Sequence, residues 1–245
     1  MSSRSSQQGV IIRKDNYLKI KGVSLNDEVN FITLQDKRKT KTQRNCFTAG
    51  HIIQLNQKAE DRFINRLEEI SELKHELLTP YLGYIPNSQN LLVIPIIEGI
   101  YGVQVKDLEI RLLYDFITEI SESDDKVAVN TQKSIFALCI ANAMLYLHEN
   151  NVVHQNLQLR TVKLAGNETN ELPHLFYYGI SEFENPKKAK FTAPELRNGR
   201  RNYSKATDVF AFGILLCQLY EEKRHTKERP EILRSIDTPL GNLIK

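Results

Sequence analysis

Apolar and polar residues alternate through the first part of the chain. The alternation runs over residues 17–53 with two polar interruptions, which predicts three antiparallel strands joined by turns. Apolar residues then recur at helical spacing over residues 59–75, so we expect a helix there. Two further short strands are predicted at about residues 81–85 and 91–97. The pattern indicates a small, strand-rich region with one helix.

The later part of the chain has a mainly helical pattern. A short helix is predicted at residues 112–120, and a polar run follows over residues 121–130. A long helix is expected over about residues 131–150, and a second strong helical stretch covers residues 205–222. One face of the long helix carries Ile135, Leu138, Asn142 and Leu145.

Composition and charge narrow the class of protein. The chain has 245 residues, of which 41% are hydrophobic and 26% charged, a balance typical of a soluble globular protein. Its formal net charge of +3 is too small to indicate binding to nucleic acid or to an anionic membrane. A basic run over residues 37–44 suits a nuclear-localisation signal or nucleic-acid patch, or a solvated hairpin tip. The hairpin tip is favoured because no aromatic residues interleave with the charges. We expect neither a nucleic-acid nor a membrane partner.

The cysteines and the N-terminus bear on the location of the protein. The three cysteines, Cys46, Cys139 and Cys217, are widely spaced and lack metal-ligand spacing, which is typical of reduced thiols. Residues 1–9 are polar and lack the apolar segment of a signal peptide. The longest apolar stretch, residues 209–220, is too short to span a bilayer. These features predict a cytoplasmic protein, with the nucleus as the alternative.

Three short motifs occur in a fixed order in the helical part. Residues 146–157 read Y-L-H-E-N-N-V-V-H-Q-N-L, residues 193–195 read A-P-E, and residues 208–213 read D-V-F-A-F-G. They resemble the catalytic loop H-R-D-L-x-x-x-N with its preceding helix, the A-P-E motif and a helix opening of protein kinases. The residues around these motifs are most similar to those of tyrosine-kinase-like and tyrosine kinases, and the chain is identified as resembling the tyrosine-kinase-like group. One match alone is a weak signal, but three in the right order make a strong one.

The resemblance implies a fold and a domain organisation. It implies a bilobal, protein-kinase-like α+β fold, with a strand-rich N-lobe that contains one helix and a mainly helical C-lobe. We expect a disordered N-terminus at residues 1–15, an N-lobe at 16–97 and a C-lobe at 98–245, forming one kinase-like domain over 16–245. Family members continue through further helices beyond the segment similar to residues 238–245, so a C-terminally truncated C-lobe is expected.

The residues that carry phosphotransfer in active kinases are replaced in this sequence. The resemblance places Asn156 at the catalytic base, and Thr161 and Tyr177 at the two magnesium ligands. It places His51 at the phosphate-binding lysine and Arg66 at the glutamate that pairs with this lysine. An amide has no basic lone pair for a substrate proton, and a phenol is a poor ligand for a hard divalent cation. No aspartate occurs between positions 125 and 208, so no shift of the alignment restores one. No catalytic residue and no metal site are expected.

The nucleotide pocket that the resemblance implies is degenerate as well. The glycine-rich loop matches residues 22–29, where Gly22 alone remains and Asp27 would bring a carboxylate near the phosphates. Lys163 takes the place of the apolar floor beneath adenine, where burial of a charged group is costly. We expect no cofactor: weak ATP binding stays open, and magnesium binding is not expected. The degenerate pocket consists of Gly22, Ser24, Asp27, Val29, Ala49, Ile94 and Lys163.

Residues that support the kinase architecture are retained. Asp208 matches the buried carboxylate that caps the backbone of the catalytic loop, a charge-assisted bond worth about 1.5–3 kcal/mol. Glu195 matches the A-P-E glutamate, and we expect no counterpart of the arginine that pairs with it in the family. The four stacked side chains that join the two lobes in the family match His154, Tyr178, Ile70 and Tyr81.

Lost chemistry on a retained scaffold favours a pseudokinase. We expect a catalytically inactive kinase-like domain that is not an enzyme and acts as a protein-interaction or allosteric signalling module. Its expected partner is a protein, either an active kinase or a second copy in a homodimer. Two alternatives remain open. One is an atypical active kinase or ATP-binding switch that transfers phosphate to Ser, Thr or Tyr with rearranged residues, and the other is a truncated, non-functional relative.

Overall fold

The protein, seen in a computed structural model, divides into two compact units, and each is described by itself. The N-terminal unit consists of residues 1–110 and 179–185, and the C-terminal unit of residues 111–178 and 186–245. The structure describes residues 17–25, 29–36, 47–52, 59–81, 83–85, 91–95, 111–120, 124–166, 171–183, 193–199 and 202–221. The predictions for residues 1–15, for the basic run 37–44 and for Asp27 lie outside these ranges. The division into lobes after residue 97 stays a prediction.

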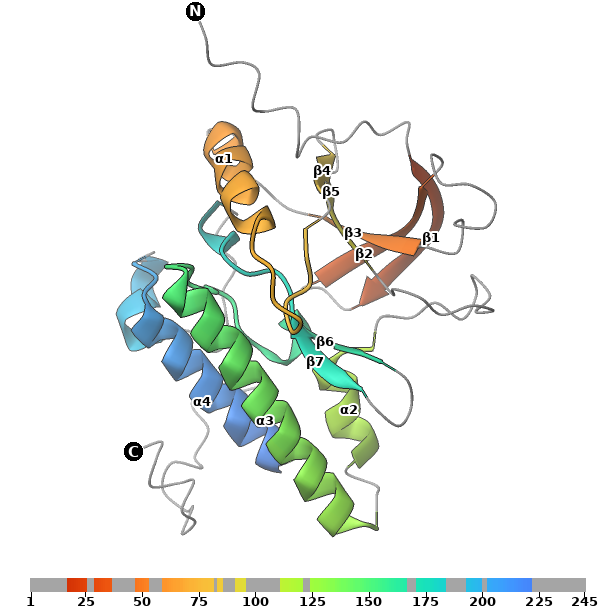
Figure 1. The fold of residues 1–245 in the computed structure, drawn as a ribbon, viewed down its shortest axis with the longest axis vertical. Helices are drawn as coiled ribbons and strands as arrows, with labels where there is room; N and C mark the ends of the chain where they lie inside the picture. Colours follow the sequence, from red (N-terminus) through yellow and green to blue (C-terminus); the bar gives the residue numbers. More distant parts are fainter. Residues whose placement is uncertain are drawn as a thin grey trace, which may run out of the picture. The chain divides into compact units, whose positions relative to one another are not determined.

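The N-terminal unit contains a five-stranded antiparallel sheet (Figure 1). Its strands are β1 (Tyr17–Leu25), β2 (Val29–Asp36), β3 (Phe47–Ile52), β4 (Gly83–Ile85) and β5 (Leu91–Pro95). They lie in the order β1-β2-β3-β5-β4. The three strands predicted from the alternation of apolar and polar residues over 17–53 are therefore present.

Helix α1 (Glu60–Ser71) belongs to the same unit and contacts β4. Its buried side chains recur at helical spacing, so one face of the helix is covered. The ring of Phe63 lies 5.1 Å from that of Tyr84 on β4, in an edge-to-face arrangement at 70°. The short 3-10 helix η4 (Ser181–Phe183) also contacts α1. The buried residues of α1 are Phe63, Ile64, Leu67 and Ile70.

The C-terminal unit is built on three helices of the described chain and one β-hairpin. In it, α3 packs against α4 and against strand β7, and α2 packs against β6. Figure 1 shows α3 and α4 side by side over most of their length. Within the described ranges, no helix is both long and apolar enough to cross a membrane. The elements are α2 (Leu113–Ile120), α3 (Lys126–Glu149), η3 (Leu159–Thr161), β6 (Val162–Ala165), β7 (Leu172–Leu175), η5 (Pro194–Gly199) and α4 (Lys205–Glu221).

Helix α3 differs from its prediction in where it begins and in which face it buries. It starts at Lys126 rather than near residue 131, because the Asp125 carboxylate caps it by accepting a hydrogen bond from the Ala128 N–H at 3.0 Å. The face with the predicted apolar residues is the exposed one: Leu138 is 72% exposed and Leu145 56%. The buried face carries Val129, Lys133, Phe136, Ile140, Ala143, Met144 and Leu147.

Candidate functional site

Asp208 joins helix α4 to the loop that follows α3. This residue is 1% exposed, and its carboxylate accepts hydrogen bonds from the backbone N–H groups of His154 at 2.7 Å and Gln155 at 2.9 Å. His148 Nε2 lies 2.8 Å from the same carboxylate. Gln155 has a φ of 71°, which is uncommon for a residue with a side chain. The bonds to Asp208 hold this loop in an otherwise unfavourable conformation.

The loop from Asn156 to Thr161 is closed by its own polar side chains. The Thr161 hydroxyl donates to the Asn156 carbonyl oxygen at 2.7 Å and accepts from the Gln158 N–H at 3.0 Å. The Asn156 side-chain oxygen accepts from Gln158 Nε2 at 3.1 Å. Thr161 is fully buried. The two positions that the kinase resemblance assigns to the catalytic base and to a magnesium ligand therefore stabilise the loop itself.

Tyr177 and Tyr178 follow strand β7 and lie beside this loop. The Phe176 N–H donates to the Thr161 carbonyl oxygen at 3.1 Å, which fixes the start of the segment. Tyr177 is buried with a φ of 64°, and such a strained backbone is found preferentially at functional sites. The Tyr178 ring is buried and lies 6.3 Å from the His154 ring, edge to face at 68°. Burial raises the pKa of the Tyr178 phenol.

His154 is held neutral by its surroundings. Burial lowers its pKa to about 4, although the nearby Asp208 carboxylate acts in the opposite direction. His154 Nδ1 accepts from the Asn156 N–H at 3.4 Å, and within the described residues His154 Nε2 has no hydrogen-bond partner. A neutral imidazole in this position serves as a packed ring rather than as a charged group.

Lys163 and His174 lie opposite each other in the β6–β7 hairpin. Lys163 is 6% exposed, so the position assigned to the floor beneath adenine holds a buried lysine in place of an apolar side chain. Burial lowers the pKa of His174 to about 4, and the charge of Lys163 acts in the same direction. The Leu164 N–H donates to the Arg111 carbonyl oxygen at 2.8 Å, which ties the hairpin to the start of α2.

The residues at the two magnesium-ligand positions do not fit a divalent cation. The Thr161 hydroxyl is buried and committed to loop backbone groups, and Tyr177 offers a phenol, whereas magnesium prefers carboxylate and water oxygens. Within the described ranges, no three His, Cys, Asp or Glu side chains are grouped so that they could hold a metal ion. We derive no metal-dependent step from these residues.

The residues of the N-terminal unit that the resemblance assigns to nucleotide and phosphate binding lie on strands of the sheet and on helix α1. His51 pairs with Phe31 and with Leu92 in the sheet. Arg66 on α1 donates from Nε to the Gly179 carbonyl oxygen at 3.4 Å. For six predicted residues, the structure describes the pairing of their strand backbones. Ala49 on β3 pairs with Ile94 on β5. The six residues are Gly22, Ser24, Val29, Ala49, His51 and Ile94.

The four residues assigned to the stack between the lobes are divided between the two units. Ile70 and Tyr81 are buried in the N-terminal unit. His154 and Tyr178 contact each other in the C-terminal unit. The stack of all four stays a prediction. Glu195, in η5, is exposed.

Sequence reasoning missed two residues that organise the site. Gln158 bridges Asn156 and Thr161, and the Q-x-x-T spacing of a capping box was the signal that could have found it. His148 contacts Asp208 across sixty positions of sequence, and no local sequence pattern predicts that contact.

Comparison with known proteins identifies the family. The family model described as "Protein tyrosine and serine/threonine kinase" matches residues 32–234. The chain therefore belongs to the protein kinase family, and its helices and small sheet are consistent with a bilobal kinase fold.

Individual relatives agree with this assignment. The chain is 29% identical over 207 residues to the lectin-domain containing receptor kinase VI.3 of Arabidopsis thaliana, covering 73% of this chain and 28% of the relative. It is 26% identical over 176 residues to tyrosine-protein kinase Fer of Mus musculus, covering 68% and 19%. It is 27% identical over 173 residues to the Aurora kinase of Eremothecium gossypii, covering 69% and 42%. The chain thus spans less than half the length of each of these relatives.

These findings correct one expectation. The degenerate positions Asn156, Thr161 and Tyr177 led us to expect a chain that is not an enzyme. That expectation is wrong, because the matched family and the relatives, each named as a kinase, point to kinase function. Replaced residues in a sequence do not by themselves demonstrate inactivity, since the reaction depends chiefly on positioning and electrostatics, to which several groups contribute.

Proposed function

We propose that this protein kinase domain, of the tyrosine-kinase-like group, acts as a protein-interaction or allosteric signalling module. One observation carries the proposal: the side chains of Asn156 and Thr161 are engaged by Gln158 and by the loop backbone. Groups that would otherwise face a substrate hydroxyl or a metal are used to hold the loop. Phosphotransfer, the activity to which the family points, would run with rearranged residues and therefore slowly.

Weak nucleotide binding is part of the proposal. Thr161 and Tyr177 supply no carboxylate for magnesium, so the phosphate charges of ATP would lack their usual counter-ions. The buried Lys163 stands where adenine would need an apolar surface. We propose that the domain needs no cofactor for its interactions and binds ATP weakly, without magnesium.

The exposed face of α3 supports a protein partner. Val127 is 79% exposed, Leu138 72% and Leu145 56%, and the three residues fall on one face of the helix. Exposed apolar residues that line up in this way are typical of interaction surfaces. We propose an active kinase or a second copy of the chain as the partner, and neither a nucleic acid nor a membrane. The cytoplasm is the proposed location, with the nucleus as the alternative.

Sedimentation velocity of the full chain tests this function with a second copy as the partner. The wild-type chain should self-associate with rising concentration, with and without ATP. Leu138→Glu combined with Leu145→Glu should abolish association, because it places two carboxylates in the apolar face. Asn65→Glu, at an exposed position of helix α1, is the control and should leave association unchanged. A wild-type chain that stays monomeric and transfers phosphate at ordinary kinase rates would contradict the proposal.

The family assignment favours a second candidate function. The chain would then be an atypical protein kinase or ATP-binding switch that transfers phosphate to Ser, Thr or Tyr. Isothermal titration with ATP separates the two candidates. A dissociation constant below ~10 μM, about −6.8 kcal/mol, would favour the switch, and weaker binding would favour the interaction module.

A further inference from the structure

Arg66 occupies a kinase position at which the resemblance places a glutamate, and it makes a contact that a glutamate cannot make. Its Nε donates to the Gly179 carbonyl oxygen at 3.4 Å, across 113 positions of sequence. Its Nη1 lies 2.9 Å from Glu69 Oε2 on the same helix. A carboxylate at position 66 would face the carbonyl oxygen with like partial charge, so the contact requires a donor.

An apolar contact lies beside this hydrogen bond. The Phe183 ring lies 6.0 Å from the Phe63 ring, edge to face at 75°, and both rings are buried. Phe63 and Arg66 are three positions apart, so they lie on the same side of α1. Gly179 and Phe183 mark the two ends of the short segment that faces them. The segment is therefore held against α1 by the hydrogen bond from Arg66 and by the ring contact with Phe63.

We propose that Arg66 is a positioning residue that couples helix α1 to the segment from Gly179 to Phe183. This segment directly follows Tyr177 and Tyr178, so the contact connects α1 with the chain next to the candidate site. A shift of α1, for example on partner binding, would move the segment with it. The coupling holds whether or not the domain transfers phosphate, and thus goes beyond the proposed function.

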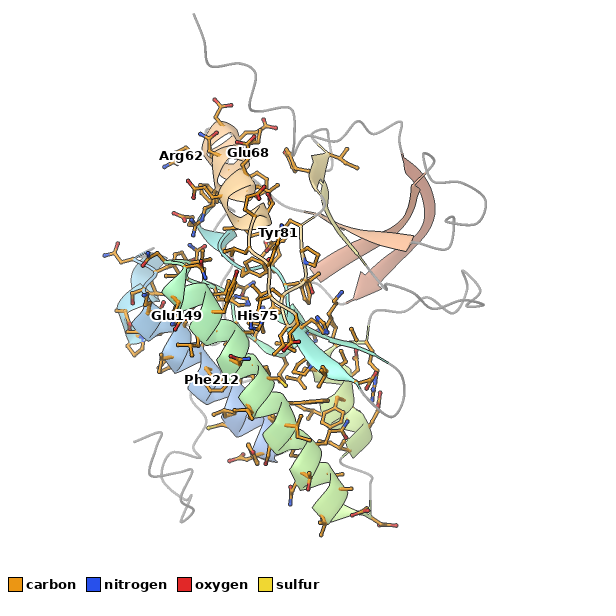
Figure 2. The ribbon with its side chains drawn as sticks, in the orientation of Figure 1. Arg62, Glu68, His75, Tyr81, Glu149 and Phe212 are labelled. Atoms are coloured by element: carbon orange, nitrogen blue, oxygen red, sulfur yellow. The ribbon has the colours of Figure 1, made fainter. Side chains whose placement is uncertain are left out.

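The chain offers matched controls for each side of the contact. Arg62 lies one turn earlier on α1, is exposed and is labelled in Figure 2. Arg62→Ala removes the same kind of side chain from the same helix. On the other side, Ser181 Oγ is buried without a hydrogen-bond partner among the described residues. Ser181→Ala should therefore leave the segment in place, because it removes no hydrogen bond.

A single tryptophan makes the coupling measurable. The chain has no tryptophan, so Phe183→Trp introduces one reporter in the segment. In the full chain, Arg66→Ala should shift the tryptophan emission to longer wavelength and increase its quenching by acrylamide, because the segment separates from α1. Arg66→Lys should restore much of the wild-type signal, since an ammonium group also donates to a carbonyl. Arg62→Ala should change neither signal.

Hydrogen exchange on chains without the reporter provides the second measurement. Arg66→Ala should speed exchange of the amides from residue 179 to residue 183 about tenfold while exchange in α3 stays unchanged. Ser181→Ala should leave both rates unchanged. Equal exchange in Arg66→Ala and the wild type would overturn the proposal. It would also be overturned if Arg62→Ala had the same effect as Arg66→Ala, or if exchange rose equally throughout the chain.

Discussion

The Thr161 hydroxyl donates a hydrogen bond to the Asn156 carbonyl oxygen across 2.7 Å. These are the two positions that a kinase resemblance assigns to a magnesium ligand and to the catalytic base. Here they are joined to each other, with Gln158 between them. The hydrogen bond between Thr161 and Asn156 stabilises the loop, in which the aspartate expected from the kinase resemblance is replaced by Asn156.

The first prediction concerns this hydrogen bond. Thr161→Val keeps the shape of the side chain but leaves the Gln158 N–H and the Asn156 carbonyl oxygen without their partner. The free energy of unfolding should fall by about 1–3 kcal/mol, as expected for buried polar groups left unsatisfied. Urea denaturation monitored by circular dichroism measures the change.

Thr131→Val is the matched control for that prediction. Thr131 is exposed on α3, and its hydroxyl donates to the Val127 carbonyl oxygen, which already belongs to the helix. Its replacement should change stability by less than about 0.5 kcal/mol. Equal effects of the two valine substitutions would show that the Thr161 hydroxyl does not hold the loop.

The second prediction concerns Asp208. Asp208→Asn removes the charge that attracts the His154 and Gln155 N–H groups and replaces one acceptor oxygen by a donor. Stability should fall by about 3 kcal/mol or more, because a buried charge network is broken. Asp124→Asn, at an exposed position before α3, should be nearly neutral. A loss smaller than that of the Asp124 variant would contradict the anchoring role.

The third prediction is a pH dependence of stability. His154 is neutral in the folded chain, with a pKa of about 4, whereas in the unfolded chain it takes up a proton near its ordinary value of 6.5. Its contribution is therefore fully present above pH 6.5 and is lost as the pH falls toward 4. The free energy of unfolding should decrease by about 1 kcal/mol per pH unit within this window.

The variant His154→Phe identifies the source of that slope. Phenylalanine keeps a ring beside Tyr178 and cannot take up a proton. Denaturation between pH 6.5 and 4.5 should show a shallower slope for this variant than for the wild type. The remaining slope should include a contribution from His174, whose pKa burial also lowers to about 4. An unchanged slope in His154→Phe would rule out His154 as the group responsible.

Sequence patterns predicted the strands because apolar and polar residues alternate in them. They predicted α1 because its apolar residues recur at helical spacing, and these residues are buried. They failed on α3, which carries apolar residues on more than one face, so that Leu138 and Phe136 look equivalent in the sequence. Periodicity cannot tell which of these faces packs. The start of α3 was missed because the cap at Asp125 lies within a polar run.

The sequence predicted which residues form the candidate site, but it did not predict which contacts these residues make. The motifs located Asn156 and Asp208, because their spacing follows the family. The hydrogen bond from Arg66 to Gly179 joins residues 113 positions apart and depends on how the chain folds back on α1. A contact between residues so far apart in the sequence leaves no periodic pattern from which it could be predicted. Family comparison, in turn, corrected the functional conclusion drawn from the replaced residues.

Transfer of radiolabelled γ-phosphate from ATP to a generic substrate tests the central claim most directly. General-base help is worth roughly 10²–10⁴ in rate, and kinases turn over at about 1–100 per second. We predict that the wild-type chain transfers phosphate below about 1 per second and that Asn156→Asp, combined with Thr161→Asn and Tyr177→Asp, is faster by at least about tenfold. The account would be contradicted by a wild-type chain that works at ordinary kinase rates and gains nothing from these three substitutions.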